Sequence, residues 1–276
     1  MPLKVEFAGE VLGTFLLVFF GCGSVCSAVT TGAFSGVVQV ALIWGIGIAT
    51  AIYLTGGLSG AHLNPAVTIS LAASGRFAPR KIVPYIVAQM IGAFLASAVL
   101  FAIYSDAITS YEQVHGIVRG EPGSEASAMV FGEYFPTPGG KPLTAEVREI
   151  MPAGRAFFAE VVGTAVLLIV ILGVTDDRNV FFPKMLTAPA IGLTITLLIS
   201  LLGPLTMACF NPARDLAPRI FSALAGWKSV PFQANGLGWL TVYCIAPVAG
   251  GLLGVLIYRL FISPSYAHYP SDKPLN

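Results

Sequence analysis

Two copies of the tripeptide Asn-Pro-Ala are the strongest chemical signal in the chain. They comprise Asn64, Pro65, Ala66, Asn211, Pro212 and Ala213. An Asn side chain accepts hydrogen bonds from the free amides of a helix's first turn, and Pro suits the first helical position because its nitrogen needs no partner there. Each copy therefore predicts the start of a helix. Because the two copies stand at matching places of a repeat, chance is a negligible explanation for the pair.

Two short helices that enter a bilayer from opposite faces would bring their amino termini together at its middle. Each terminus carries about half a positive charge from its aligned peptide dipoles, so the meeting point repels cations and protons. The side-chain amides of Asn64 and Asn211 would donate to a passing oxygen atom, which orients water and interrupts a proton-conducting chain. The chemistry predicted for this pair is the passage of neutral, hydrogen-bonding solutes.

The backbone ahead of each tripeptide is predicted to be extended, and its carbonyls need partners that lipid does not supply. A wet pore supplies them, so pore-lining carbonyls are expected from Gly60, Ala61, His62, Met207 and Cys209. For the His62 side chain we expect a packed or capping role and no metal site.

Three charged residues stand alone in apolar surroundings. Because a charge at the bilayer centre costs at least roughly 3 kcal/mol, Arg214 is predicted to donate into the lumen rather than to face lipid. Its neighbour Asp215 is not expected to pair with it, since adjacent helical residues do not face each other. Glu10 and Glu160 occupy equivalent places in the repeat and are predicted to be structural buried acids that hold backbone amides, with a proton relay as the alternative.

Long apolar segments must position these groups. The chain is 55% hydrophobic and 11% charged, whereas a soluble domain has about 25% charged residues. Six blocks carry almost no charge, at 7–33, 34–75, 82–105, 156–175, 185–213 and 229–258. Each reaches the roughly 20 residues that cross a bilayer, and the second and fifth leave room for an additional short apolar piece. The predicted fold is an all-α membrane protein with six transmembrane helices and two re-entrant half-helices.

The chain is predicted to be an inverted tandem repeat. Its two halves open with Glu10-Val-Leu-Gly13-Thr14 and Glu160-Val-Val-Gly163-Thr164, and three crossings per half invert the second copy, which places the functional site between them. We expect one channel domain over 1–276, with repeats at 1–106 and 156–262, a connecting loop at 107–155 and a tail at 263–276. The region 106–155 holds seven of the 14 acidic residues, so the loop is expected to be exposed to solvent.

Other classes of protein are disfavoured. The net charge of +1 argues against nucleic-acid binding, and no cofactor is expected, because the cysteines lack metal-ligand spacing and the three histidines are too scattered for an enzyme's active site. A secondary transporter would need an ionisable pair for its coupling ion. Apart from the two glutamates and Arg214, no predicted span carries such a pair. An adhesive role for the connecting loop stays open. The distribution of Lys and Arg weakly favours amino and carboxyl termini on the cytoplasmic side.

The paired Asn-Pro-Ala boxes, the repeated Glu-x-x-Gly-Thr starts and the run GGLSGAHLNPAVT resemble the aquaporin and glycerol facilitator family, the major intrinsic proteins, over essentially the whole chain. Asp215 and Arg219 match the marker positions of its glycerol-conducting branch, and Tyr104 and the stretch 175–177 also look like that branch. The resemblance implies the aquaporin fold and a homotetramer in a plasma or bacterial inner membrane, with one pore in each protomer.

The resemblance also implies a narrow outer filter. Its matching positions are Trp44, Ile199, Ala208 and Arg214. The Trp44 indole would take the carbon backbone of a polyol while Arg214 donates to its hydroxyls, although Trp is also common as an interfacial anchor. The bacterial glycerol facilitator has Gly at position 199 and Phe at position 208, so this set looks more like plant nodulin-26-type channels.

These patterns together predict a passive channel for small uncharged solutes. Glycerol is the expected main solute, with water also permeant and with protons and ions excluded. The alternatives are a water-selective aquaporin, whose usual Phe and His are missing from the filter, or a nodulin-26-type channel for urea, metalloid acids or ammonia.

Overall fold

The computed structural model describes residues 1–268, and six of the helices in this part of the chain are long and apolar enough to cross a membrane. The six predicted spans are therefore confirmed. They are α1 (Leu3–Thr31), α2 (Val37–Ser59), α4 (Ile82–Val114) with η1 (Pro79–Lys81) before it, α7 (Ala153–Val174), α8 (Thr187–Thr206) with η2 (Lys184–Leu186) before it, and a last span made of α11 (Gly238–Leu240), η4 (Thr241–Ile245), α12 (Ala246–Ile257) and η5 (Tyr258–Ile262).

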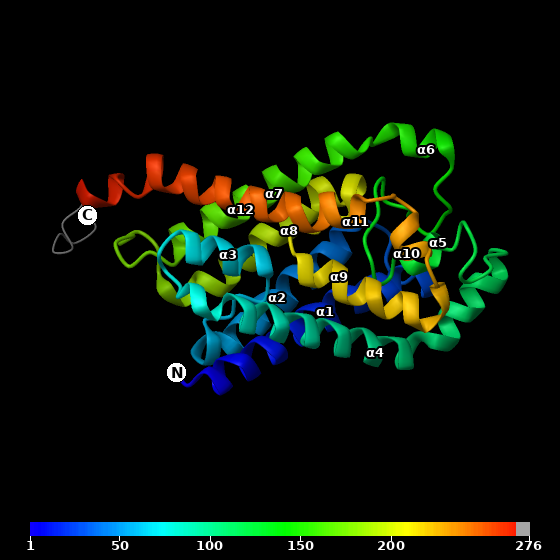
Figure 1. Ribbon diagram of the computed structural model, residues 1–276, viewed down its shortest axis with the longest axis horizontal. Helices are drawn as coiled ribbons and strands as arrows, with labels where there is room; N and C mark the ends of the chain where they lie inside the picture. The colour runs from blue at the N-terminus through cyan, green and yellow to red at the C-terminus, as the bar shows by residue number, and fades with distance from the viewer. Residues whose placement is uncertain (269–276) are drawn as a thin grey trace.

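Two further helices are too short to cross a bilayer, which takes about 20 residues. They are α3 (Pro65–Ala73), with 9 residues, and α9 (Pro212–Ser222), with 11. Each begins at the Pro of an Asn-Pro-Ala tripeptide. In Figure 1 the two run in from opposite ends of the long axis, and they contact each other. This is the arrangement expected of re-entrant half-helices.

The packing of the two halves is related by the repeat. In the first half α1 packs against α2 and α4, and in the second α7 packs against α8 and α12, while α2 and α8 join the halves. A Cβ on Gly92 would lie 2.3 Å from the Val11 oxygen, and one on Gly250 would lie 2.3 Å from the Val161 oxygen. In each half the first span, α1 or α7, therefore crosses the last span, α4 or α12, with the two backbones in direct contact. Each half-helix also packs against the last span of the other half, α3 on α12 and α9 on α4.

The segment between α4 and α7 folds over one end of the molecule and includes α5 (Glu125–Ala128) and α6 (Ala145–Ile150). The expectation that it is exposed is wrong for its middle part, where side chains are at most 5% exposed at Ala126, Ala128, Met129, Val130, Phe131 and Tyr134. The reason is its apolar composition, since the Phe131 ring packs against Phe221 and Trp227 at centroid distances of 5.4 and 5.8 Å. We call residues 115–152 the outer cap.

The remaining short elements lie around the two ends. Next to the outer cap are η3 (Ala223–Trp227) and α10 (Val230–Gln233), and η6 (Ser265–His268) follows the last span. In Figure 1 the amino terminus and η5 lie at the end of the long axis opposite the outer cap. The tail predicted for 263–276 lies partly outside the described residues.

Candidate functional site

The two Asn side chains cap the half-helices as their sequence context predicts. Asn64 Oδ1 accepts from the backbone nitrogen of Ala66 at 2.8 Å, and Asn211 Oδ1 accepts from that of Ala213 at 3.1 Å. Because the side-chain oxygen is used for capping, the amide nitrogen of each Asn is turned away from its own helix.

The amide nitrogens of the two Asn residues reach across to the opposite half. Asn64 Nδ2 donates to the Phe210 oxygen at 2.7 Å, and Asn211 Nδ2 donates to the Leu63 oxygen at 2.8 Å. Each accepting carbonyl belongs to the residue just before the other Asn. These reciprocal bonds fix the two helix starts against each other. Each amide retains a second N–H that can donate a hydrogen bond to a solute oxygen.

Two buried carboxylates hold the loops that lead into the half-helices. Glu10 accepts from the backbone nitrogens of His62 and Leu63 at 3.0 and 2.8 Å. Glu160 accepts from those of Cys209 and Phe210 at 3.1 and 2.8 Å.

Each carboxylate also takes a hydroxyl from the end of a span. Ser59 donates to Glu10 and Thr206 donates to Glu160, both at 2.6 Å. Both acids are 0% exposed. Within residues 1–268, the groups that contact the Glu160 carboxylate are the Thr206 hydroxyl and the backbone nitrogens of Cys209 and Phe210. All three donate to it, which fits a scaffold better than a proton relay.

The loops held in this way adopt a backbone conformation that L-residues avoid. In the first loop Ala61 and Leu63 have φ of 51° and 54°, and in the second Ala208 and Phe210 have φ of 60° and 51°. Such residues cost of order 1–3 kcal/mol each and collect at functional sites. Glu10 and Glu160 offset part of this cost, because they accept from backbone nitrogens of the two loops.

A cavity of about 760 Å³ runs past both loops. Its lining includes residues of both loops, among them the five positions predicted to supply carbonyls: Gly60, Ala61, His62, Met207 and Cys209. Asn64 and Asn211 also line it. Apolar residues also line it, among them Leu17, Ile48, Ile52, Leu167, Ile171, Ile191 and Ile195. The cavity is thus lined both by residues of the two loops and by apolar side chains.

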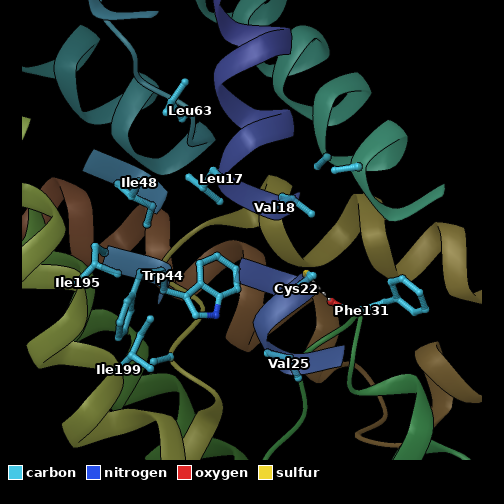
Figure 2. Packing of buried hydrophobic residues seen from close by; sticks show 14 of the residues in the cluster. Leu17, Val18, Cys22, Val25, Trp44, Ile48, Leu63, Phe131, Ile195 and Ile199 are labelled. Carbon is cyan, nitrogen blue, oxygen red and sulfur yellow. Dashed lines mark hydrogen bonds between the residues drawn. The ribbon is translucent and has the colours of Figure 1, made fainter. Parts of the chain in front are cut away.

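A second cavity of about 380 Å³ lies on the outer-cap side. Both cavities are lined by Trp44, Ile199, Met207 and Arg214, so three of the four filter positions implied by the family resemblance stand where the two cavities meet. The fourth, Ala208, lines the larger cavity. The guanidinium carbon of Arg214 lies 4.5 Å from the centre of the Trp44 ring, and in Figure 2 the Trp44 indole lies with Ile195 and Ile199 on one side and Cys22 on the other.

Arg214 is bound by the outer cap, which the sequence-based interpretation missed. Its Nε lies 2.7 Å from Glu133 Oε1, and its Nη1 donates to the Phe131 oxygen at 2.8 Å and to Cys22 Sγ at 3.3 Å. A usable signal was present: Glu133 is the single acid in the apolar run 126–136, and a buried Arg needs a counter-charge.

Asp215 pairs with Arg219, which lies one helical turn further on, as expected of residues four apart in a helix. Arg219 Nη2 lies 2.7 Å from Asp215 Oδ1, and both side chains are at most 2% exposed. Asp215 Oδ1 also accepts from the Glu133 backbone nitrogen at 2.7 Å, and Arg219 donates to the Glu133 oxygen. The pair therefore anchors the outer cap beside the filter.

The His62 side chain packs against two aromatic rings. Its ring lies 4.5 Å from that of Phe77 and 4.9 Å from that of Tyr85, and its Nδ1 lies 3.2 Å from Thr68 Oγ1. Within residues 1–268 no group of three or more His, Cys, Asp or Glu side chains is placed to hold a metal ion.

An ion-pair cluster lies at the other mouth of the larger cavity. Asp176 is contacted by Arg178 Nη2 at 2.8 Å and Arg76 Nη2 at 2.6 Å, and Tyr258 donates to it. Hydrogen bonding from Arg178 holds the pKa of the Asp176 carboxyl below its ordinary value. The cluster ties the chain after α3, the loop after α7 and the last span together at this mouth.

Comparison with known proteins agrees with this geometry. The family model described as "Major intrinsic protein" matches residues 2–258. The glycerol uptake facilitator protein of Haemophilus influenzae is 42% identical over 259 residues, covering 93% of each chain, and that of Escherichia coli (strain K12) is 41% identical over 272 residues, covering 98% of this chain and 91% of the relative.

Two further proteins extend the comparison. A propanediol uptake facilitator of Salmonella typhimurium is 39% identical over 262 residues, or 94% of each chain. The X-ray structure of the aquaglyceroporin from Plasmodium falciparum superposes with a TM-score of 0.81 at 29% identity, covering 97% of this chain and all of that one. With its six spans, its opposed half-helices and this likeness over nearly its whole length, the chain belongs to the major intrinsic protein family.

Proposed function

We propose that this chain is a passive channel that conducts glycerol and water and excludes protons and ions. As a major intrinsic protein it is a multi-pass membrane channel and not an enzyme. The observation that carries the choice of solute is the mixed lining of the cavity, which combines loop residues with several Ile and Leu side chains. We infer that the loop backbone forms one wall and the apolar side chains the other. A glycerol molecule has hydroxyls along one edge and carbon along the other, so it matches both walls at once.

The filter positions would act on the solute as follows. Trp44 and Ile199 offer an apolar corner to the carbon backbone, and Arg214 donates to hydroxyl oxygens. Ala208 leaves room on the side of the second loop. Two walls of different character suit a polyol better than water, which has no apolar edge.

Exclusion of protons and ions is assigned to the meeting point of α3 and α9. Their amino termini supply a positive potential, and the free amide hydrogens of Asn64 and Asn211 orient the oxygen of a passing molecule. Asn64 and Asn211 are each 5% exposed, so a cation that reached them would have lost most of its hydration.

Light-scattering measurements on proteoliposomes test the proposal. Vesicles are exposed in turn to glycerol, 1,2-propanediol and urea, and to an impermeant osmolyte for water. Re-swelling in glycerol well above that of empty vesicles, together with water flux, is the expected result. Water flux without re-swelling in any of the three solutes would instead support a water-selective channel, and preference for urea would support a nodulin-26-type channel.

Assembly and orientation are further parts of the proposal. We infer a homotetramer, repeats at 1–106 and 156–262 joined by residues 107–155, and termini on the cytoplasmic side. Chemical cross-linking of the purified protein would test the tetramer. Labelling of single Cys residues, placed at Ser35 and at Lys4 in a cysteine-free variant, would test the orientation, since only the first should react from outside.

A further inference from the structure

We propose that Glu133 determines the selectivity of the outer filter: its carboxylate neutralises Arg214 and holds the guanidinium against the wall, leaving one donating nitrogen, Nη2, for the solute. This inference rests on the proposed function, because it concerns how the same filter distinguishes glycerol from water. It assigns a filter role to the outer cap, a segment outside both Asn-Pro-Ala loops.

The geometry of the pair carries the first step. Arg214 Nε and Glu133 Oε1 are 2.7 Å apart, and the side chains are 3% and 1% exposed. Both residues line the larger cavity. At this distance and burial the two charges interact strongly, because little water screens them. The negative charge of Glu133 therefore offsets the positive charge of Arg214 in the narrow part of the passage.

The remaining contacts of the guanidinium carry the second step. Nη1 is occupied by the Phe131 oxygen and Cys22 Sγ, and Nε lies against Glu133. Among residues 1–268 the contacts of the guanidinium thus use Nε and Nη1, and Nη2 remains for a solute. The guanidinium carbon lies 4.5 Å from the centre of the Trp44 ring, so the donor and the ring stand side by side, and a polyol that uses both has one orientation.

The outer cap is built so that Glu133 cannot move away from the filter. Its backbone nitrogen donates to Asp215 and its oxygen accepts from Arg219. Just after Glu133 in the chain, the Tyr134 nitrogen contacts Met207 Sδ at 3.3 Å, and Thr137 Oγ1 accepts from the Met207 nitrogen at 3.2 Å. Asp215 and Arg219 are therefore positioning residues that act on Arg214 through Glu133.

Loss of the negative charge should change selectivity in a defined direction. With Glu133→Gln the guanidinium loses its counter-charge and can extend into the lumen, which hinders a three-carbon polyol more than water. We expect the ratio of glycerol to water permeability to fall about tenfold, equivalent to 1.4 kcal/mol. This ratio does not depend on how many channels each vesicle contains, so reduced folding yield alone cannot change it.

Three further variants make the test specific. Glu112→Gln is the matched control, since Glu112 is another buried acid near the outer cap, 2.7 Å from Arg119, and its ratio should equal that of the wild type. Glu133→Asp keeps the charge but retracts it by one methylene, so its ratio should rise or stay equal. In the Arg214→Gln background, Glu133→Gln should leave the ratio unchanged, because the effect passes through Arg214.

The outcomes separate the two levels of the proposal. Wild-type vesicles impermeable to glycerol would overturn the proposed function and this inference together. Two results would overturn the inference alone, given wild-type vesicles that are permeable to glycerol. One is a glycerol-to-water permeability ratio in Glu133→Gln equal to that of the wild type. The other is a fall of this ratio on adding Glu133→Gln to Arg214→Gln that is as large as the fall in the wild-type background. If Glu133→Gln does not fold, Glu133→Asp decides, because a ratio below that of the wild type would contradict the retraction of Arg214.

Discussion

Glu160→Gln is a sharp test of how the pore loops are held. The carboxylate accepts from the backbone nitrogens of Cys209 and Phe210 through different oxygens, and from the Thr206 hydroxyl. A Gln side chain has one accepting oxygen, and its NH2 group must face one of the two backbone donors. One buried N–H is thus left without an acceptor, which costs about 1–3 kcal/mol.

The expected consequence is a loss of both stability and conduction. A cost of that size lowers the Tm of a chain of this length by roughly 2–10 °C. Conduction should fall as well, because the Phe210 oxygen is the acceptor for Asn64 and residues of this loop line the cavity. Thermal unfolding in detergent and glycerol-driven re-swelling of vesicles measure the two effects on the same preparation.

The control for this experiment is an acid of the outer cap. Glu121 is 57% exposed and lies 3.2 Å from Lys228, and an exposed pair of this kind contributes about 0–1 kcal/mol. Glu121→Gln should therefore match the wild type in both assays. A Glu160→Gln channel that is as stable and as conductive as Glu121→Gln would refute the role assigned to the buried acid.

Three further predictions concern the filter, the packing and one pore mouth. Trp44→Ala should widen the range of solutes and Ala208→Phe should slow glycerol more than water, and vesicle permeabilities unchanged in both would show that the filter is misplaced. Gly45→Leu should prevent folding, because a Cβ there lies 2.4 Å from the Gly192 oxygen, whereas Gly56→Leu meets open space in the same helix and should fold, as detergent-solubilised yield will show. Asp176 has a folded-state pKa below its unfolded value, so its contribution to stability is complete above the unfolded pKa of about 3.9 and is lost as the pH falls toward the folded pKa. Asp176→Asn should flatten the acid side of a plot of Tm against pH, and an unchanged slope would contradict this.

Local signals explain why much of the fold could be predicted from the chain. Spans follow from apolar length, and the half-helices follow from Asn64 and Asn211 because capping depends only on neighbouring residues. The repeat placed Glu10 and Glu160 in equivalent environments, and the structure gives them equivalent partners.

The outer cap could not be predicted in the same way. It has no periodic pattern, and its acids and turn residues are typical of an exposed loop, yet its apolar middle packs on Phe221 and Trp227, far away in the sequence. Likewise the partner of Arg214 depends on tertiary packing, which brings Glu133 across 81 positions of the chain. The sequence signals only that a buried Arg needs a counter-charge and that Glu133 is the single acid in an apolar run. Which acid meets Arg214 is decided by the packing.

The central claim is that two opposed half-helices leave a passage open to neutral solutes and closed to charge. It is tested most directly by recording glycerol re-swelling and the signal of an internal pH dye on the same proteoliposomes under an imposed proton gradient. The account predicts rapid, non-saturating glycerol entry with proton flux equal to that of empty vesicles. Glycerol entry that saturates and depends on the gradient, or proton flux that rises with the amount of channel, would contradict it.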